Sequence, residues 1–466
     1  MTHSLKNKLI GDKAFYKMVM AVAVPIMIQN GITNFVGLLD NIMVGLIGTE
    51  QMSGVAIANQ LIFIFNLCIF GALSGAGIFG AQFYGKGDHE GVRYSFRFKL
   101  FISIALCAVA TAVFSLFGSQ LISLYLSEND APELIAATLK HGKSYLVVMI
   151  FGLLPFALSQ VYSGTLRECG ETMLPMKAGI IAVFVNLVLN YVFIFGKLGF
   201  PAMGGVGAAL ATVVSRYVEL LIIVIVAHKN KLRFPFLEGA YKSVYIPGRL
   251  TKQIIIKGMP LLLNESAWSI GRAFITQLFS VRGLAVIAGM NISNTVGNLF
   301  NVVYFAMGNA IAIIVGQLLG AGKNEEAKDT DTKLIFFSIV SCLLVSVGLV
   351  IASPFIPMIY NTTDEVRHLA SWFIIITAIC TPLFAFANSC YFTLRSGGKT
   401  VLTFLFDSVF VWVVNIPMTF ALVYFTDLHI LPLYFIVQFS DIIKCIFGYI
   451  LVKKGIWIQN VVSDQQ

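Results

Sequence analysis

Acidic side chains lie inside long apolar stretches of this 466-residue sequence. Asp40 is the clearest case, because no basic residue lies near it in the sequence and Gly37 and Gly45 permit close backbone approach on either side. A buried carboxylate without a counter-charge has two inexpensive solutions, which are to bind a proton or to bind a cation. Asp40 is therefore our first candidate for an ion site, and a solvated structural role at a helix end is the alternative.

Neutral oxygen donors stand in two later apolar stretches. Asn186 and Asn190 are four residues apart and therefore share one face of a helix, and Thr212 adds a hydroxyl group in the next stretch. Amide oxygens can ligate Na⁺ or accept a hydrogen bond from a protonated carboxyl group. Interhelical hydrogen bonding, which is common for Asn and Thr in membranes, is the alternative interpretation.

Glu265 is the leading acid of the second half of the chain. It is a candidate for a second acid that serves either the coupling ion or the substrate. Arg272 follows seven residues later, two helical turns on and on roughly the same face. A salt bridge between Glu265 and Arg272 would make the acid structural, and the sequence leaves both interpretations open.

The other polar residues in apolar stretches carry weaker signals. Arg216 and Glu219 are three residues apart and are predicted to form a local ion pair. Asp407 and Asp441 have little polar sequence around them and are weaker candidates. The seven Cys residues form no CxxC pair and the six His residues are dispersed, so we expect neither a metal motif nor a catalytic cluster, and an intramembrane enzyme is disfavoured.

The elements that must carry these residues are membrane-spanning helices. Hydrophobic residues make up 58% of the chain and charged residues 12%, whereas soluble domains are about 45–50% apolar and about 25% charged. The apolar runs are continuous and reach the roughly 20 residues that a spanning helix needs, which favours helices over a membrane β-barrel. Twelve spans are predicted, at about 15–45, 52–83, 97–126, 134–164, 173–196, 205–228, 252–280, 286–318, 332–358, 366–394, 400–424 and 430–452.

The formal net charge of +9 follows the membrane topology and does not indicate a nucleic-acid partner. Basic residues gather in alternate loops, and the loops between them are richer in acid, which is the positive-inside pattern. The pattern predicts a multi-pass protein of the cell membrane with both termini in the cytoplasm, which agrees with an even number of spans. The basic residues are Lys6, Lys8, Lys13, Lys86, Arg93, Arg97, Lys99, Arg167, Lys229, Lys231, Arg233, Lys242, Arg249, Lys323, Lys328, Arg395, Lys399, Lys453 and Lys454, and the acidic ones are Glu50, Glu128, Asp130, Asp364 and Asp427.

An internal repeat relates the two halves of the chain. We predict two six-helix bundles related by a pseudo-twofold axis along the membrane normal, with residues 1–228 as the first lobe, 229–249 as a cytoplasmic linker and 250–466 as the second lobe. A binding cavity between two such bundles suits alternating access. At a sequence offset of 235 the matches are Pro25 with Pro260, Gly48 with Gly283, Asn59 with Asn294, Asn66 with Asn301, Gln82 with Gln317, Gly85 with Gly320 and Gly87 with Gly322. At an offset of 228 they are Thr165-Leu166-Arg167, Gly170 and Thr172 with Thr393-Leu394-Arg395, Gly398 and Thr400.

With these features the chain resembles the multidrug and toxic compound extrusion (MATE) family over nearly its whole length. The resemblance rests on the two six-span halves, on Asp40, on the two Thr-Leu-Arg loops and on the Gly-rich segments 80–87, 316–322 and 204–212. It implies an antiporter that exports amphipathic, often cationic, compounds against Na⁺ or H⁺. It also implies a cation site formed by Asp40, Asn186, Asn190 and Thr212, with Na⁺ as a metal ion that could occupy it.

Two positions of this sequence modify what the resemblance implies. Some family members carry a second Asp where Asn190 stands, so a mechanism that needs paired Asp residues does not fit, and neutral oxygens beside one carboxylate favour Na⁺. Other members place a functional acid on the seventh span, close to Glu265 but about one turn away.

Three other functions remain as alternatives at the level of sequence. The nearest is a flippase or exporter of a lipid-linked or polysaccharide precursor, which a cavity lined with Arg would favour; a channel and an intramembrane enzyme are weaker. We expect no enzymatic activity and no cofactor beyond the coupling ion. The expected partners are small amphipathic or cationic substrates and membrane lipid, and we expect a monomer.

Overall fold

The computed structural model describes residues 9–126, 132–360 and 362–463, apart from the side chains of Leu38, Asn41 and Thr49. Lys6, Lys8, Glu128 and Asp130 of the charge pattern lie outside the described residues. The described chain is helical and contains no strand. Apolar stretches form helices because a helix satisfies all its backbone hydrogen bonds within one segment, which a membrane requires.

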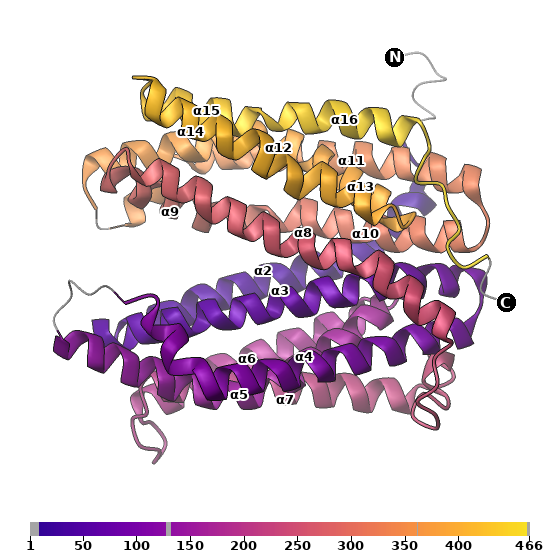
Figure 1. Cartoon of the computed structure of the whole chain (residues 1–466), viewed down its shortest axis with the longest axis horizontal. Coiled ribbons are helices and arrows are strands. Elements are labelled where there is room, and N and C mark those ends of the chain that lie inside the picture. Colours follow the sequence, from indigo (N-terminus) through magenta and orange to yellow (C-terminus); the bar gives the residue numbers. More distant parts are fainter. Residues whose placement is uncertain (1–8, 127–131, 361, 464–466) are drawn as a thin grey trace. The chain divides into compact units, whose positions relative to one another are not determined.

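The helices fall on the twelve predicted spans, with boundaries that differ by up to eight residues, and confirm a polytopic all-α membrane protein (Figure 1). In the first half they are α2 (Lys13–Gly45), α3 (Thr49–Lys86), α4 (His89–Ser123), α5 (Pro132–Glu168), α6 (Met173–Phe195) and α7 (Gly205–Lys229), followed by the short η1 (Pro235–Leu237). In the second half they are α8 (Gly248–Ser280), α9 (Leu284–Phe300), α10 (Val302–Gly320), α11 (Asn324–Ala352), η2 (Ile356–Ile359), α12 (Asp364–Ser396), α13 (Thr400–Phe404), η3 (Leu405–Val409), η4 (Val411–Asn415), α14 (Ile416–Phe425), α15 (Ile430–Phe439) and α16 (Asp441–Lys453).

Several of these elements combine into one span each. Within the part of the chain that the structure describes, eleven helical segments are long and apolar enough to cross a membrane. Residues 400–425 form one of these segments and residues 430–453 form another. Helix α10 is also one of the eleven, and the shorter apolar helix α9 precedes it in the same predicted span. The predicted span that is not among these eleven is the seventh, which corresponds to α8; this helix has 33 residues but contains polar side chains such as Asn264, Glu265 and Arg272.

The repeat is visible in the backbone as well as in the sequence. Gly87 and its equivalent Gly322 end their helices with φ of 78° and 74°, and Gly170 and its equivalent Gly398 do so with φ of 79° and 70°. Only glycine adopts this left-handed conformation without steric cost, so both halves retain it at the same turns. The equivalent glycines therefore have the same backbone conformation in the two repeats.

The described chain forms two compact units. The N-unit comprises residues 28–80 and 89–252, and the C-unit comprises the residues up to 27, 81–88 and those from 253 onward. Helices α2 and α3 thus contribute residues to both units, and the linker belongs to the N-unit. The predicted division at 1–228, 229–249 and 250–466 stays a prediction about which parts move.

In the N-unit, α7 is the central helix and packs along α5 and α6, while α4 packs along α5. The linker after α7 folds onto α4, where Arg97 donates to the carbonyl oxygens of Gly239 (2.8 Å), Ala240 (2.8 Å) and Tyr245 (3.0 Å). The linker is therefore an ordered part of this unit.

In the C-unit, α12 is the central helix and packs against α9, α10, α11, α15 and α16. Helix α12 also packs against α13, and Figure 1 shows α12, α13 and α16 in this unit. The chain after α16 lies against the end of α3, where Gln82 donates to the carbonyl oxygens of Ser396 (2.9 Å) and Gln459 (3.1 Å) and accepts from the backbone of Val461 (2.8 Å).

Equivalent residues of the two repeats meet reciprocally within the C-unit. A methyl group added to Gly85 would overlap the backbone of Gln317, and one added to Gly320 would overlap the backbone of Gln82. At the sequence offset of 235, Gly85 corresponds to Gly320 and Gln82 to Gln317, so the two contacts are equivalent. The ends of α3 and α10 thus approach each other so closely that glycine is required at both positions.

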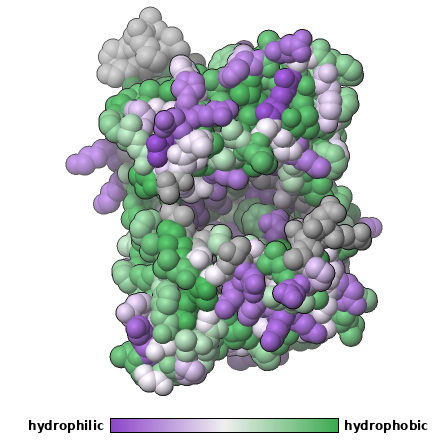
Figure 2. All heavy atoms as spheres, turned by 90° about the vertical axis from the view of Figure 1, so that its left-hand side faces the viewer, coloured by the Kyte–Doolittle hydropathy of each residue, from purple (hydrophilic) through white to green (hydrophobic). Residues whose placement is uncertain are grey.

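Large apolar side chains are exposed along the helices of both units, among them Leu344, Phe151 and Phe184, as expected of surfaces that face lipid. Figure 2 views the molecule end-on, and here polar side chains interrupt the apolar surface at the helix ends. This distribution fits helices whose flanks lie in the membrane and whose ends meet water.

Candidate functional site

Three helices of the N-unit carry the predicted ion-site residues. Asp40 lies near the end of α2, Asn186 and Asn190 lie on one face of α6, and Thr212 lies two turns into α7. Gly207 lets α7 pack closely on α6, because a methyl group there would lie 2.7 Å from the carbonyl carbon of Phe193. Small residues at such crossings are typical of helix packing in membranes.

The structure brings these four residues, which we call the N-unit cluster, into one chain of contacts. Asn190 Nδ2 donates to Asp40 Oδ1 over 2.6 Å and to Asn186 Oδ1 over 3.2 Å, and Asn186 Nδ2 lies 3.3 Å from Thr212 Oγ1. Asn186 and Asn190 are buried, with 6% and 1% of their surface exposed, and Asp40 is half-buried. The cluster therefore holds one carboxylate beside buried, neutral side chains.

The Asn186 amide finds better hydrogen-bond partners when its nitrogen faces the Asp40 carboxylate. With the oxygen and nitrogen of its amide exchanged, Asn186 donates to both oxygens of Asp40 at 3.1 Å and accepts from Thr212 Oγ1 at 3.3 Å. Asn190 Oδ1 is buried and accepts no hydrogen bond from any residue that the structure describes. A buried carbonyl oxygen without a donor is costly, and it is a group that a cation would satisfy.

Charged and polar residues surround the N-unit cluster. The predicted pair is confirmed: Arg216 Nη1 lies 3.3 Å from Glu219 Oε2, and the Arg216 guanidinium stacks on the ring of Phe156 at 4.9 Å. Arg216 and Tyr145 lie within electrostatic range of Asp40. Because Arg216 is bound to Glu219, it leaves the Asp40 carboxylate without a direct ion pair among the described residues.

Glu265 sits in a different environment, in the C-unit on α8. It accepts a hydrogen bond of 3.3 Å from the Tyr391 hydroxyl group on α12. The ion pairs found among the described residues do not include Glu265 with Arg272, so the structure does not support that alternative. Arg272 lies within electrostatic range of Tyr304 and Tyr434.

Asp407 has a rich polar environment, which the sequence did not reveal. Lys444 Nζ lies 2.8 Å from Asp407 Oδ1, and Asn264 Nδ2 lies 3.2 Å from Asp407 Oδ2. Ser408 donates to the side-chain oxygen of Asn264 over 2.7 Å. Sequence reasoning missed Lys444 and Asn264; the available signal was a Lys deep inside an apolar span, which is as expensive as an acid there.

Two further buried charges were also missed. Lys99 Nζ lies 2.5 and 2.6 Å from the two carboxylate oxygens of Glu168, and 3.1 Å from Thr165 Oγ1. Asp331, only 1% exposed, accepts a hydrogen bond of 2.6 Å from Thr393. Lys99 thus contacts Thr165, and Asp331 contacts the equivalent Thr393 of the second repeat. A buried charge therefore binds the first Thr of both Thr-Leu-Arg segments, which indicates a structural role.

The donor atoms of the N-unit cluster determine which cations could bind there. Across the described ranges no three His, Cys, Asp or Glu side chains gather closely enough to hold a metal ion. A cation in the N-unit cluster would rely on one carboxylate with amide and hydroxyl oxygens. Alkali ions and protons suit such a donor set, whereas tightly bound transition metals do not.

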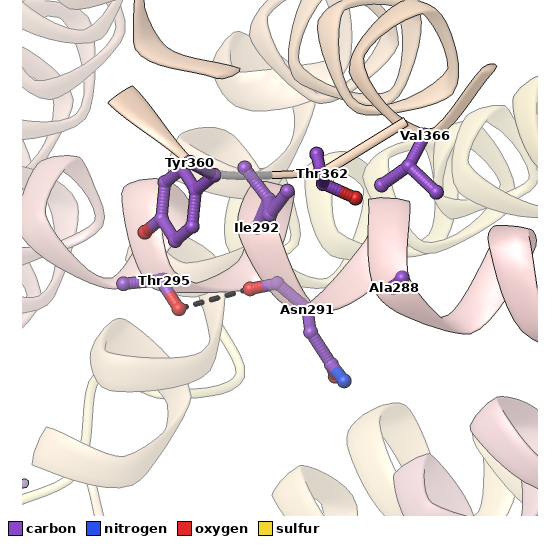
Figure 3. A pocket seen from close by; sticks show the side chains of 7 residues that line it. All are labelled: Ala288, Asn291, Ile292, Thr295, Tyr360, Thr362 and Val366. Atoms are coloured by element: carbon purple, nitrogen blue, oxygen red, sulfur yellow. Dashed lines mark hydrogen bonds between the residues drawn. The ribbon is translucent and has the colours of Figure 1, made fainter. Parts of the chain in front are cut away.

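A surface pocket of about 310 Å³ lies elsewhere in the C-unit, between α9 and the start of α12. Figure 3 shows Tyr360, Thr362 and Val366 facing α9, where Thr295 donates to the carbonyl oxygen of Asn291 over 2.9 Å. None of its lining residues carries a formal charge, and none belongs to the groups around Asp40 or Glu265. The pocket therefore adds no ionisable group to either site.

Comparisons with known proteins place the chain in context. The MatE family model matches residues 25–192 and 260–421, one stretch in each repeat. The probable multidrug resistance protein NorM of Thermotoga maritima is 26% identical over 456 residues, which are 97% of this chain and 95% of that protein. The probable multidrug resistance protein YoeA of Bacillus subtilis is 24% identical over 430 residues, or 91% of each chain.

Solved structures show the same fold. A MATE transporter in the straight conformation superposes with a TM-score of 0.84 at 20% identity, covering 97% of this chain and 98% of that one. A MOP superfamily transporter from Pyrococcus furiosus superposes with a TM-score of 0.83 at 19% identity, with coverage of 97% and 98%. The arrangement of helices is thus shared over nearly the whole length.

Proposed function

Because this chain belongs to the multidrug and toxic compound extrusion family, we propose that it is a Na⁺-coupled antiporter that exports amphipathic, cationic compounds. The chain is a multi-pass membrane transporter and not an enzyme. The observation that carries the proposed ion site is the N-unit cluster, where one half-buried carboxylate meets two buried amides and a hydroxyl group. The names of the similar proteins support drugs as the exported class.

The chemistry of the cluster suggests how ion binding and conformation are linked. Without a cation, Asn190 Nδ2 donates to Asp40, and so does Asn186 with its amide exchanged. When Na⁺ binds, it takes over the carboxylate, and the amides of Asn186 and Asn190 can turn their oxygens toward it with Thr212. Ion binding would therefore replace hydrogen bonds between α2, α6 and α7 with contacts of these helices to the ion. Coupling follows if this rearranged packing favours one side of the transport cycle.

We propose that the two halves, residues 1–228 and 250–466, are the bodies that move during transport, joined through residues 229–249. Glu265 is the second acid in this proposal, where it favours cationic substrates. The basic residues at the ends of the helices support cytoplasmic termini in the cell membrane. A single chain contains both repeats, and this supports a monomer as the working unit.

The test is efflux of tetraphenylphosphonium from liposomes that contain the purified protein, with Na⁺ and H⁺ gradients imposed separately. We expect efflux with an inward Na⁺ gradient at constant pH. Efflux that follows only the pH gradient would assign the coupling to protons. Failure to move any organic cation, together with translocation of a lipid-linked precursor, would favour the flippase.

Site variants make the test specific. Asp40→Asn should abolish gradient-driven efflux, and Glu265→Gln should reduce it in part. The matched control is Asp364→Asn, because Asp364 is an exposed acid at the start of α12 that pairs with nearby Arg367. Full efflux by Asp40→Asn would remove Asp40 from the mechanism.

A further inference from the structure

The C-unit contains a polar cluster of its own, built around Asn264 and Asp407. We call it the C-unit cluster: Asn264 and Glu265 of α8, Tyr391 of α12, Asp407 and Ser408 of η3, and Lys444 of α16. Asn264 links its members, because its amide nitrogen lies 3.2 Å from Asp407 Oδ2 and 3.4 Å from the Tyr391 hydroxyl group. Four helical elements thus converge on one group of side chains.

The backbone at Asp407 is locally altered. Residues Leu405–Val409 and Val411–Asn415 form π-helical turns inside an otherwise α-helical span. π-turns are rare and often occur at functional sites, because they insert a residue and rotate the following side chains. Here the first turn places Ser408 so that its hydroxyl group donates to the backbone oxygen of Asn264 over 2.7 Å. The irregularity and the polar cluster therefore coincide.

Lys444 supplies the positive charge of the C-unit cluster from inside the protein. Its side chain is only 8% exposed, its ammonium group lies 2.8 Å from Asp407 Oδ1, and it faces the ring of Phe410 at 5.3 Å. A buried ammonium group persists only when it is paired with an acid. Lys444 is thus held where its charge meets Asp407.

Charged residues around this position come from every adjoining element. Glu265 lies within electrostatic range of Asp407 and of Arg395 on α12. Lys444 lies within the same range of Asp441, one turn earlier on α16, and of Arg272 on α8. Acids and bases of α8, α12 and α16 therefore surround Lys444 and Asp407. In the N-unit cluster, by contrast, Asp40 bonds to neutral amides.

We propose that Lys444 is a tethered cation that takes the place of an exchangeable ion in the C-unit cluster. Its ammonium group satisfies Asp407, so Na⁺ does not bind there while Lys444 is in place. One chain then exchanges one cation, in the N-unit cluster. The count of one exchangeable ion rests on the proposed function, whereas the tether itself rests only on the contacts of Lys444.

Removal of the tether should create an ion site. In Lys444→Gln, the Asp407 carboxylate loses its ammonium partner. The carboxylate of Glu265 and the hydroxyl group of Tyr391 belong to the same cluster, and the Asn264 amide, which donates to Asp407 in the wild type, supplies an oxygen ligand when it turns. Two carboxylates with an amide and a hydroxyl group form a hard-oxygen donor set that suits Na⁺. Lys444→Arg, which retains a cation, is the matched control and should create no site.

The experiment measures equilibrium binding of radioactive Na⁺ to the purified full-length protein at pH 8. We expect one ion per chain for the wild type, none for Asp40→Asn, and one again for Asp40→Asn/Lys444→Gln. Adding Asp407→Asn to that double variant should weaken binding more than tenfold. The inference is overturned if the folded double variant binds no Na⁺, or if Asp40→Asn alone binds an ion that Glu265→Gln removes.

Two further readouts separate the possible failures. If neither the wild type nor Asp40→Asn binds Na⁺ but the double variant does, the tether stands and Na⁺ coupling at Asp40 is wrong. If Lys444→Gln does not fold, the test uses Asp40→Asn, which keeps Lys444, and measures its melting temperature. We expect that temperature to be the same in NaCl and in choline chloride, and a Na⁺-dependent rise that Glu265→Gln abolishes would refute the tether.

Discussion

Asn190→Asp is the substitution that should change the coupling ion of this transporter. Asn190 Nδ2 lies 2.6 Å from Asp40 Oδ1 and is buried. A carboxyl group in its place adds a second acid directly against the first without changing the size of the side chain. The substitution therefore tests whether the single carboxylate of the N-unit cluster selects Na⁺.

The size of the effect follows from the geometry. Two carboxylates in this contact place their charges about 4 Å apart, and at an effective dielectric constant of about 20 their repulsion is about 4 kcal/mol. Each ~1.4 kcal/mol is a factor of ten in population, so the doubly ionised pair is disfavoured by roughly three powers of ten. The pair should therefore retain one shared proton near neutral pH and release it only when another cation or a conformational change compensates.

The assay is the liposome efflux measurement with separate gradients. We expect the wild type to respond to Na⁺ and not to pH, and Asn190→Asp to acquire efflux driven by an inward proton gradient. Asn190→Leu is the matched control, since it keeps the approximate volume but supplies neither amide nor acid, and it should respond to neither gradient. If Asn190→Asp keeps the Na⁺ dependence of the wild type and ignores the pH gradient, the reasoning about the single carboxylate is wrong.

Two structural predictions complete the set. Lys99→Met should lower the free energy of unfolding by about 3–5 kcal/mol because it leaves Glu168 charged and buried, whereas Lys99→Met/Glu168→Gln should return to within about 1 kcal/mol of the wild type. Thermal unfolding in detergent measures both, and equal losses for the single and double variants would show that the pair is not coupled. Arg97→Gln should speed proteolysis within residues 230–247 at least tenfold, because three hydrogen bonds to linker carbonyls are lost, each worth about 1.5–3 kcal/mol. Exposed Lys242→Gln is the control, and an unchanged cleavage rate in Arg97→Gln would contradict the anchoring role.

The N-unit cluster could be predicted from sequence because its signals are local. Asn186 and Asn190 share a face of one helix, and Asp40 stands out as an acid in an apolar run. Their approach to Thr212 was implied by the family resemblance and follows from the packing of α6 on α7. Helical periodicity was enough to find the candidates, although not the orientation of their amides.

The C-unit cluster could not be predicted because its parts are spread over four elements. Asp407 has apolar neighbours along its own span, and its partners Asn264 and Lys444 lie 143 and 37 residues away. Lys444 follows Asp441 by three residues, which in sequence suggests a local pair. The π-turns also break the 3.6-residue period that such reasoning assumes.

The repeat shows that the two halves place their polar clusters at different depths. At the sequence offset of 235, Asp40 corresponds to Ile275, whereas Asn264 corresponds to Gln29, eleven residues before Asp40. At about 1.5 Å per residue this is roughly 16 Å along the helix. Gln29 accepts a hydrogen bond of 2.5 Å from Arg167 and packs against Gly179, the equivalent of Asp407 at the offset of 228.

The same contact between equivalent helix positions therefore exists in both halves, but it carries different chemistry. In the N-unit, Gly179 leaves no acid beside Gln29, and the carboxylate stands three turns away with neutral ligands. In the C-unit, Asp407 occupies that position and needs a permanent counter-ion, which Lys444 provides. In these proposals, the repeat gives both halves the same scaffold. The position of one acid in each half then determines which half exchanges an ion and which half uses the ammonium group of its own Lys444.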